Sequence, residues 1–503
     1  MKPRMISLLV LALLYIPLTA QGQTAGDEPT VFVRGYSFSG NTLVADEELA
    51  RALEEFTGRE LTFMDLLVAA SQVDLYYLRL GYPLVDAFLP AQEIVDGIVR
   101  VEIIEGRLGE VVLTNESALK DSVARAVVAP LAPGAFVRAD TLDRALLLLS
   151  DVPGLVTEAS LVAGSAHGTS DLVLHLRDGR RSRYTLSANT FGSEETGKVR
   201  FGVVADFLNL TGRGDELSVG ASTDGSLTSA LNLGYSVLVG RGSRAGVDLA
   251  ASRQALGGEF AGAGFETSRF SLALSLTYPW LRSEFENRYV EASLERASSR
   301  DNLFGVDNDK ERTNVAVTLR GDASGLLGDA WRYSLRATYG TTAASLTPAA
   351  EPYQKLNGDL AHVRMLAGGF QLLASLAAQW AFAELDTSER MVISGPDGVR
   401  GHPSGDSGDS GFLGRLELHK GFELPFDSGT WAASGFVDAG LLQQRSLPPG
   451  DVENVTRRYG YGLGLDWNIA PGVSIQIQRA WPWGPGADEH PRGQLWMKAS
   501  VQF

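Results

Sequence analysis

Apolar and polar positions in the first third of the chain alternate with two different periods. Stretches with period two predict strands, and spacings of three and four predict helices. The second predicted helix has one apolar face, formed by Leu66, Ala70, Val73, Tyr77 and Leu80. From residue 31 to 106 the elements run strand, helix, helix, strand, strand, namely Val31–Phe38, Glu47–Phe56, Thr62–Leu80, Ala87–Leu89 and Ile98–Ile104. This order predicts a small α+β domain.

The same order of elements returns between residues 108 and 178. Asp140 is expected to be the N-cap of the second helix, and Pro153-Gly154 to end the helical region. The elements are Val111–Leu113, helices near Leu119–Val128 and Thr141–Leu149, then Thr157–Val162 and Asp171–Arg177. Two copies of a unit of about 75 residues indicate an internal repeat of a βααββ domain.

From about residue 183 to Phe503 the pattern changes to short alternating segments between polar turns. Such segments of about 10 residues are typical of a transmembrane antiparallel β-barrel, and their number predicts about 16 strands. The last segment is the clearest, because Leu495, Met497, Ala499, Val501 and Phe503 alternate with mostly polar residues. Trp496 does not fit this alternation and is expected near a membrane interface. A soluble β-sandwich is the alternative, but it accounts neither for the glycines within strands nor for the terminal Phe503.

Residues 386–410 form a long polar loop that contains Val399, Arg400, Gly401 and His402. A later strand carries Phe436, Asp438 and Gly440, which share one face by the period-two rule. An arginine on a long loop and an aspartate on the inner wall of a closed sheet lead to the hypothesis that the loop is folded into the lumen and held there by a charge pair.

Composition narrows the classes of protein. The chain has 503 residues, no Cys and a formal charge of -16. The acidic balance argues against a nucleic-acid binder, and the lack of Cys argues against a disulfide scaffold or a thiol enzyme. Residues 1–22 combine a basic start with a short apolar run, which predicts a secretory signal peptide. The protein is therefore expected to be exported.

No enzyme-like motif has a supporting context. Gly405-Asp406-Ser407-Gly408 lies in the polar tract of the long loop, and Arg213-Gly214-Asp215 is expected to be a tight turn. The six histidines show no metal-ligand spacing. We therefore predict no catalytic residues, no metal and no cofactor.

Several motifs resemble a known family. Phe38-Ser39-Gly40-Asn41-Thr42, Gly81-Tyr82 and Glu105-Gly106 resemble the first polypeptide-transport-associated (POTRA) domain of the ShlB type. Leu142 to Leu147, followed by Asp151-Val152-Pro153-Gly154, resembles the second. Asn209 to Leu217 resembles the first hairpin of two-partner-secretion (TpsB) transporters. The chain is thus similar to the ShlB/FhaC/HecB transporters of the haemolysin secretion/activation family.

The resemblance implies a domain plan and a function. The plan is a signal peptide (1–22), two α+β POTRA domains (31–107 and 108–180) and an outer-membrane β-barrel (183–503) whose loop 386–410 folds inward. The implied function is to capture an unfolded, TpsA-like exoprotein in the periplasm and move it through the barrel to the cell surface. The implied partners are outer-membrane lipid and lipopolysaccharide, together with the barrel assembly machinery that inserts the protein into the membrane.

The resemblance also assigns roles to residues. The loop is expected to be held to the lumen wall by Val399, Arg400, Gly401 and His402 on one side and Phe436, Asp438 and Gly440 on the other. The loop is expected to follow strand 11, and the wall residues to lie on strand 13. His402 departs from the family pattern, which has an aromatic residue there. A client groove in the first POTRA domain is expected from Leu66, Val73, Tyr77, Ala87 and Leu89, and the barrel-assembly signal from Val501 and Phe503. For any single groove residue the simpler interpretation is that it fills the domain's own core.

Three other functions remain open at this point. A barrel-assembly insertase of the same superfamily shares the inward loop but has differently patterned POTRA units. A passive porin or a surface adhesin would not need POTRA repeats. An outer-membrane enzyme would need a catalytic constellation that the sequence does not show.

Overall fold

The computed structural model describes residues 29–193, 195–325, 328–345, 347–423, 429–446 and 454–503. The predicted signal peptide lies outside these residues. The chain divides into two compact units, residues 1–106 and 107–503. Within the described ranges, no helix combines the length and the apolar character required to cross a membrane.

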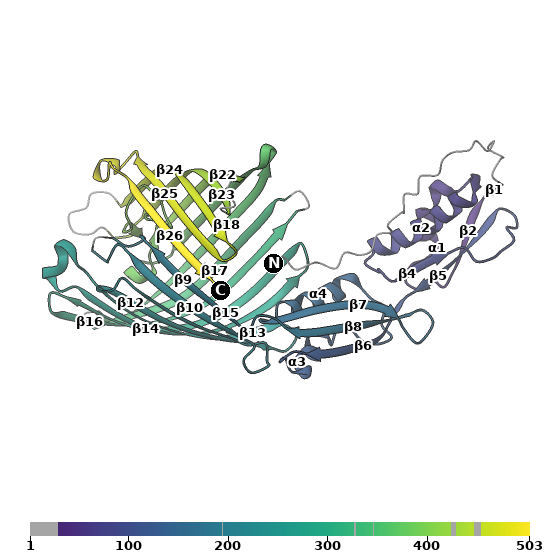
Figure 1. Cartoon of the computed structure of the whole chain (residues 1–503), viewed down its shortest axis with the longest axis horizontal. Helices are drawn as coiled ribbons and strands as arrows, with labels where there is room; N and C mark the ends of the chain where they lie inside the picture. The colour runs from purple at the N-terminus through teal and green to yellow at the C-terminus, as the bar shows by residue number, and fades with distance from the viewer. Residues whose placement is uncertain (1–28, 194, 326–327, 346, 424–428, 447–453) are drawn as a thin grey trace. The chain divides into compact units, whose positions relative to one another are not determined.

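The first unit contains a three-stranded sheet and a separate two-stranded sheet (Figure 1). The larger sheet has the order β2-β5-β4, with β2 parallel and β4 antiparallel to β5. The smaller sheet pairs β1 with β3, which the sequence did not predict. Its elements are β1 (Thr30–Val33), β2 (Gly35–Ser39), α1 (Asp46–Ala52), η1 (Glu54–Phe56), β3 (Arg59–Thr62), α2 (Phe63–Arg79), β4 (Val85–Phe88) and β5 (Ile98–Glu105).

Helix α2 begins where its sequence provides a cap. The Thr62 side chain accepts a hydrogen bond from the Asp65 backbone N, and the Asp65 carboxylate accepts one from the Thr62 backbone N. This reciprocal arrangement satisfies two backbone donors of the first turn. The buried face of α2 consists of Leu66, Ala69, Ala70, Val73 and Tyr77, which pack against the sheet.

A buried glutamate ties the turn after β2 to the end of β5. Glu105 accepts hydrogen bonds from the backbone N of Thr42 and Leu43 and from the Tyr77 hydroxyl, each at 2.8 Å. Burial opposes ionisation of Glu105, but these bonds outweigh it and hold the pKa of Glu105 below its usual value. The residues that carry the family motif therefore have a structural role in this domain.

The second unit begins with a domain of the same topology. Its sheet has the order β6-β8-β7, with β6 parallel and β7 antiparallel to β8, as in the larger sheet of the first unit. The prediction of Asp140 as an N-cap was wrong, because the helix starts two residues earlier with Arg138 at the cap, and Asp140 pairs with Arg138 at 2.8 Å. The elements are β6 (Arg107–Glu116), α3 (Asp121–Val128), α4 (Ala139–Ser150), β7 (Leu155–Ala163) and β8 (Thr169–Asp178).

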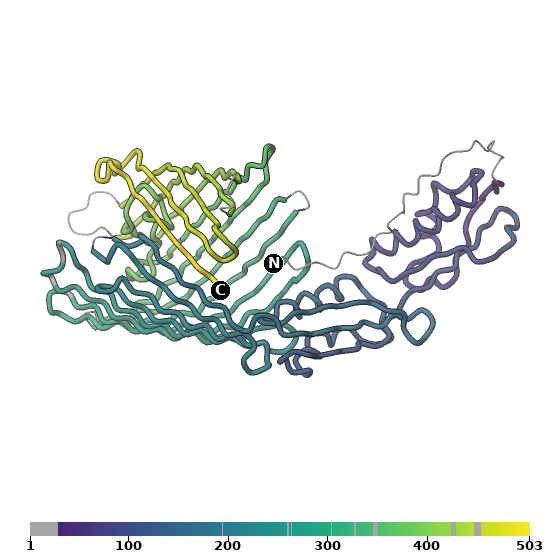
Figure 2. The backbone as a smooth tube through the Cα atoms, in the orientation of Figure 1, coloured from purple at the N-terminus to yellow at the C-terminus, as the bar shows by residue number. Residues whose placement is uncertain are grey.

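The rest of the second unit is a closed antiparallel barrel in which β26 pairs with β9 (Figures 1 and 2). Sixteen strands of the described residues form it, so the predicted fold class is confirmed. They are β9 (Ser182–Asn189), β10 (Arg200–Leu208), β11 (Glu216–Thr223), β12 (Thr228–Val239), β13 (Ser243–Ala255), β14 (Glu266–Arg282), β15 (Glu286–Leu303), β16 (Val306–Ser324), β17 (Ala330–Ala344), β18 (Thr347–Leu366), β19 (Phe370–Ala381), β22 (Ser410–Glu423), β23 (Thr430–Gln443), β24 (Val455–Ala470), β25 (Val473–Trp483) and β26 (Gln494–Gln502).

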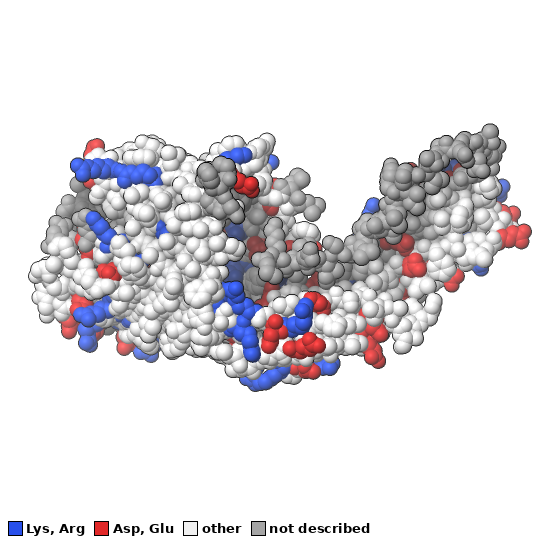
Figure 3. Space-filling view, in the orientation of Figure 1, with Lys and Arg blue, Asp and Glu red and all other residues white. Residues whose placement is uncertain are grey.

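The outer face of the barrel is apolar. On β14, the large exposed side chains alternate with smaller or polar residues, and they are Phe270, Leu272, Leu274, Leu276, Tyr278 and Trp280. Much of the barrel face in Figure 3 carries no charged side chain. An apolar surface this extensive is unfavourable in water and suits contact with lipid.

Between β19 and β22 the chain forms the inward loop, residues 386–410. The loop contains a short helix, η4 (Thr387–Glu389), and a two-residue strand pair, β20 (Met391–Val392) with β21 (Ser407–Gly408). Counted from β9, the loop follows the eleventh barrel strand and Phe436–Gly440 lies on the thirteenth, β23, as predicted. The remaining short helices are η2 (Gly258–Ala263), η3 (Ala367–Gly369) and η5 (Ala487–Glu489).

Candidate functional site

The tip of the inward loop lies against inward-facing residues of β23. On this strand, Ser434, Phe436, Asp438, Gly440 and Leu442 are buried, so every second residue points into the barrel. The loop brings Arg400 to the middle of this row, where the arginine is only 2 % exposed. Because a buried guanidinium needs compensating acceptors, its surroundings decide whether this position is stable.

Arg400 forms a bidentate ion pair with Asp438. Its Nε donates to Asp438 Oδ2 at 2.9 Å and its Nη2 donates to Oδ1 at 2.6 Å. The backbone N of Arg400 also donates to Oδ2, at 3.1 Å. The two oxygens of Asp438 thus hold both the side chain and the backbone of the loop tip, an arrangement that only a planar guanidinium permits.

Two further wall residues contact the guanidinium. Glu417, on the neighbouring strand β22, pairs with Arg400 Nη1 at 3.0 Å. The ring of Phe436 lies under the guanidinium, with 3.5 Å from Arg400 Cζ to the ring centroid, which is a cation–π contact. The arginine therefore has a partner on each side, and Phe436 contacts it directly.

Trp496 also holds the loop tip, which the sequence did not predict. Its Nε1 donates to the carbonyl oxygen of Arg400 at 2.8 Å, and its side chain is 4 % exposed. The ring of Phe191, just after β9, lies edge-on to that of Trp496 at 6.2 Å. Trp496 thus faces the lumen, and the expectation that it lies near an interface was wrong. We call Arg400, Asp438, Glu417, Phe436 and Trp496 the tip anchor.

The residues beside Arg400 fit closely against the wall. A Cβ on Gly401 would lie 2.6 Å from backbone atoms of Trp481 and Pro482, and one on Gly440 would lie 2.9 Å from Ile393. At Gly401 the backbone atoms cannot give way, so only glycine fits, whereas a side chain at Gly440 would have to displace Ile393. Val399 and Ile393 are buried together in a small apolar cluster. His402 is also buried, and since a carbonyl can only accept, its Nε2 donates to Tyr459 O at 3.2 Å.

The base of the inward loop has a second set of ion pairs. Glu389 lies between Arg312 on β16 and Lys355 on β18, with both N–O distances at 2.8 Å. Lys355 Nζ also donates to the backbone carbonyl of Glu389 at 2.9 Å. All three side chains are largely buried. We call these three residues the base anchor. No local pattern along the chain indicated it, because its members are far apart in the sequence.

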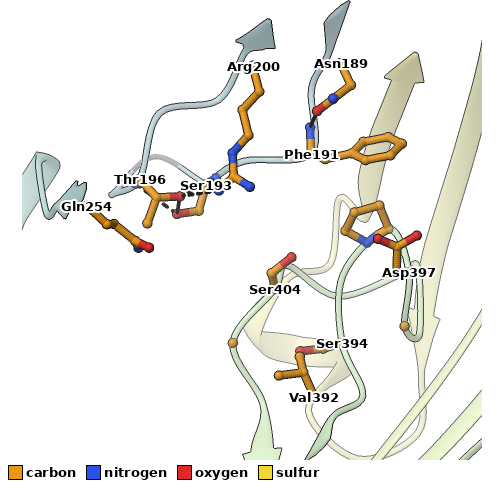
Figure 4. Close-up of a pocket in the computed structure, with 13 residues that line it drawn as sticks. Asn189, Phe191, Ser193, Thr196, Arg200, Gln254, Val392, Ser394, Asp397 and Ser404 are labelled. Atoms are coloured by element: carbon orange, nitrogen blue, oxygen red, sulfur yellow. Dashed lines mark hydrogen bonds between the residues drawn. The ribbon is translucent and has the colours of Figure 1, made fainter. Parts of the chain in front are cut away.

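The loop and the β9–β10 connection leave space between them. A cavity of about 600 Å³ lies there, shown in Figure 4. One wall comes from the connection, including Phe191, Thr196 and Arg200, and the other from the loop, including Ser394 and Asp397. Polar residues such as Thr196, Arg200, Ser394 and Asp397 share the lining with apolar ones such as Phe191 and Val392.

The residues predicted for the client groove lie mostly in the core of the first unit. Leu66, Val73, Tyr77 and Ala87 are buried, and Leu89 is half-buried beside them. They therefore fill the domain's own core instead of lining an open surface. Other apolar residues of α2 are exposed, namely Phe63, Met64, Leu67, Val68, Leu75 and Leu78. The helical period identifies the buried face, so it could not identify this outer one.

Val501 and Phe503, the predicted assembly signal, lie on the outer face of the barrel. Val501 is paired with Leu186 of β9, and Phe503 exchanges backbone hydrogen bonds with Tyr184 at 2.9 and 3.0 Å. Both side chains are exposed, Phe503 more than half. The last residues thus lie at the closure of the barrel.

Known proteins resemble the chain over most of its length. The heme/hemopexin transporter protein HuxB of Haemophilus influenzae (strain 86-028NP) is 28 % identical over 508 residues, which cover 97 % of this chain and 89 % of HuxB. The outer membrane transporter CdiB of Dickeya dadantii is 22 % identical over 93 % of this chain and 85 % of its own. The structure of CdiB from Escherichia coli matches with a TM-score of 0.74 at 19 % identity, over 97 % of this chain and 93 % of that one, which supports the fold.

Two family models also match the chain. A POTRA domain of the ShlB type matches residues 31–106, and the haemolysin secretion/activation protein ShlB/FhaC/HecB matches residues 168–466. The resemblance predicted from the motifs is therefore confirmed. The chain belongs to the ShlB/FhaC/HecB family of haemolysin secretion/activation proteins, and is an outer-membrane transporter of two-partner secretion with periplasmic POTRA domains, which acts with a secreted exoprotein.

Proposed function

We propose that the first POTRA domain captures an unfolded exoprotein and that the exoprotein then passes through the barrel lumen to the cell surface. The observation that carries this proposal is the inward loop, which is fixed inside a closed barrel by the tip anchor. A loop fixed at one position occupies a constant part of the lumen, so the width of the remaining path is constant as well. We infer that Arg400 and Asp438 set the width of the path.

Capture would use the edge strand β4 and the neighbouring helix α2. An extended client can add to an exposed sheet edge through its backbone, which requires no particular sequence. The exposed apolar residues of α2 offer contacts for alternate side chains of such a client. We call the surface between α2 and β4, with the side chains of Leu67, Asp74 and Leu78 and the backbone N–H of Ala87, the client groove.

Two further parts of the proposal concern the protein's own insertion. The exposed row on β14 would contact outer-membrane lipid and lipopolysaccharide. Val501 and Phe503, exposed at the closure of the barrel, would be recognised by the barrel assembly machinery. No step of this proposal requires a catalytic residue, a metal or a cofactor.

Replacing Arg400 tests the role of the tip anchor. The variant Arg400→Ala should insert normally but secrete much less of the partner exoprotein. Insertion is checked by the gel shift between boiled and unboiled samples, and secretion by the amount of exoprotein in the medium. The matched control is Arg296→Ala, which removes an arginine from an exposed ion pair on β15. Secretion by Arg400→Ala at the level of this control would contradict the proposal.

A further inference from the structure

On the outer edge of β4, the backbone N–H of Ala87 already has a hydrogen-bond partner within the domain. In an antiparallel pair, the backbone N–H of every second residue points away from the partner strand. The Ala87 N–H points away from β5, because it donates to the Asp74 side chain of α2, with 2.7 Å from N to Oδ1. Asp74 Oδ1 thus occupies the place that a carbonyl oxygen of an added strand would take.

Asp74 has no cationic partner. Its carboxylate is partly buried, and among the described residues no lysine, arginine or histidine contributes to its electrostatic surroundings. Burial raises the pKa of Asp74 to about 6, the Ala87 hydrogen bond opposes this, and the nearby carboxylate of Asp86 adds to it. A positive charge brought to this position would therefore be favourable.

The whole domain shares this acidic character. Between residues 31 and 106 the sequence has five arginines, no lysine and thirteen Asp or Glu, a formal charge of -8. Acidic side chains are visible on the face of this domain in Figure 3. Such a surface attracts cationic segments and repels acidic ones.

The groove has apolar walls beside its single carboxylate. Leu67 lies seven residues before Asp74 and Leu78 four residues after it, so all three share one side of α2. Leu67 is 38 % exposed and Leu78 is 52 % exposed. The surface therefore combines two apolar contacts, one negative charge and one strand-edge donor.

We propose that Asp74 gives the client groove its selectivity, by holding the Ala87 N–H until an extended segment with a lysine or arginine among apolar residues replaces it. The client's backbone carbonyl then accepts from Ala87 N, and the displaced carboxylate pairs with the client's cation. This inference rests on the capture step proposed above. It adds the chemical class of the segment that is captured.

The test uses the full-length protein in lipid nanodiscs and three synthetic ten-residue peptides. The peptides alternate valine with threonine and carry lysine, glutamine or glutamate at one central position. Binding is measured by fluorescence anisotropy, and its location by hydrogen exchange of the segment 84–89. The wild type should bind the lysine peptide about fivefold more tightly than the glutamate peptide, as expected for a partly exposed ion pair. The lysine peptide should also slow exchange of segment 84–89.

Variants separate charge from hydrogen bonding. Asp74→Asn keeps an acceptor for the Ala87 N–H but should abolish the preference for lysine. Asp74→Ala should speed exchange in segment 84–89 and tighten binding of the glutamine peptide. Glu60→Gln removes one exposed charge from β3 and should keep the preference. Continued protection of the core segment 99–103 from exchange shows that each variant is folded.

The outcomes distinguish the two proposals. If the peptides bind at segment 84–89 but with equal affinity, or if Asp74→Asn keeps the preference, the selectivity of Asp74 is wrong and capture at β4 stands. If no peptide slows exchange there, both the selectivity and the proposed capture at β4 are wrong.

Discussion

The tip anchor and the client groove use the same chemistry at very different strengths. Asp438 accepts three hydrogen bonds from Arg400 in a buried site, with Glu417 and Phe436 on the other sides of the guanidinium. Asp74 accepts one bond from the Ala87 backbone and has apolar, exposed neighbours. A contact with several simultaneous partners stays closed, whereas a single bond at an edge can be exchanged. The first arrangement suits a fixed part of the pore and the second suits a reversible binding surface.

The largest effect is expected from breaking the tip anchor. Removing Arg400 or Asp438 alone leaves a buried charge without its main partner, which costs on the order of 3–5 kcal/mol locally. The double variant Arg400→Ala with Asp438→Ala should cost clearly less than the sum, because the stranded charge is gone. Hydrogen exchange of residues 396–404 measures the local free energy. If the cost of the double variant equalled the sum of the two single costs, direct coupling between Arg400 and Asp438 would be contradicted.

A somewhat smaller effect is expected at the base anchor. Glu389→Gln leaves Lys355 with a neutral partner, whereas Arg312 keeps Glu295 at 3.2 Å. The change should loosen the loop base by about 2–3 kcal/mol. Exchange of residues 386–392 should rise while residues 396–404 change little, since the tip has its own partners. Equal loosening of both segments would show that the two anchors form one cooperative unit. Glu384→Gln, on a residue that is more than half exposed, is the control.

Trp496→Phe should have a moderate effect on the tip. The variant keeps an aromatic ring beside Phe191 but leaves the Arg400 carbonyl without its donor, at a cost of about 1–2 kcal/mol. Faster exchange at the tip and a changed single-channel conductance in planar lipid bilayers are expected. Trp483→Phe, at an exposed position on β25, is the matched control and should change neither.

The smallest effect concerns the pH dependence of the first POTRA domain. The pKa of Asp74 is raised to about 6 in the folded domain. As pH rises from the pKa of Asp74 in the unfolded chain to pH 6, the unfolded chain loses this proton before the folded domain does. The stability of the domain therefore falls over this range. Glu105 acts in the opposite sense at lower pH, because its folded pKa is lowered and its contribution is lost as pH falls. Exchange of segment 99–103 in the full-length protein, corrected for intrinsic rates, should show a loss of protection between pH 4.5 and 6.5. Asp74→Asn should remove this loss, and Glu60→Gln should not.

Much of the fold followed from local pattern. Helical spacing located α2 to within one residue at each end, because Thr62 and Asp65 cap its start and Gly81 follows its end. Period-two alternation predicted the barrel and placed Phe436, Asp438 and Gly440 on one face of β23. By contrast, the pair β1–β3 was missed, since the chain changes partner near Arg34 without a change in composition.

Local periodicity was enough to assign the apolar face of each element, and the family motifs connected Arg400 with Asp438. Which side chains meet inside the barrel depends on how the closed sheet surrounds the loop. Trp496 follows the alternation of β26 toward the lumen, but an apolar ring there is stable only because Arg400 O and Phe191 reach it from other elements. Glu389 and Asp74 likewise acquire their partners from strands that local periodicity cannot pair with them. The physical reason is that periodicity reports how one element is buried, whereas a buried polar group is satisfied by atoms that only the closed fold brings within hydrogen-bond distance.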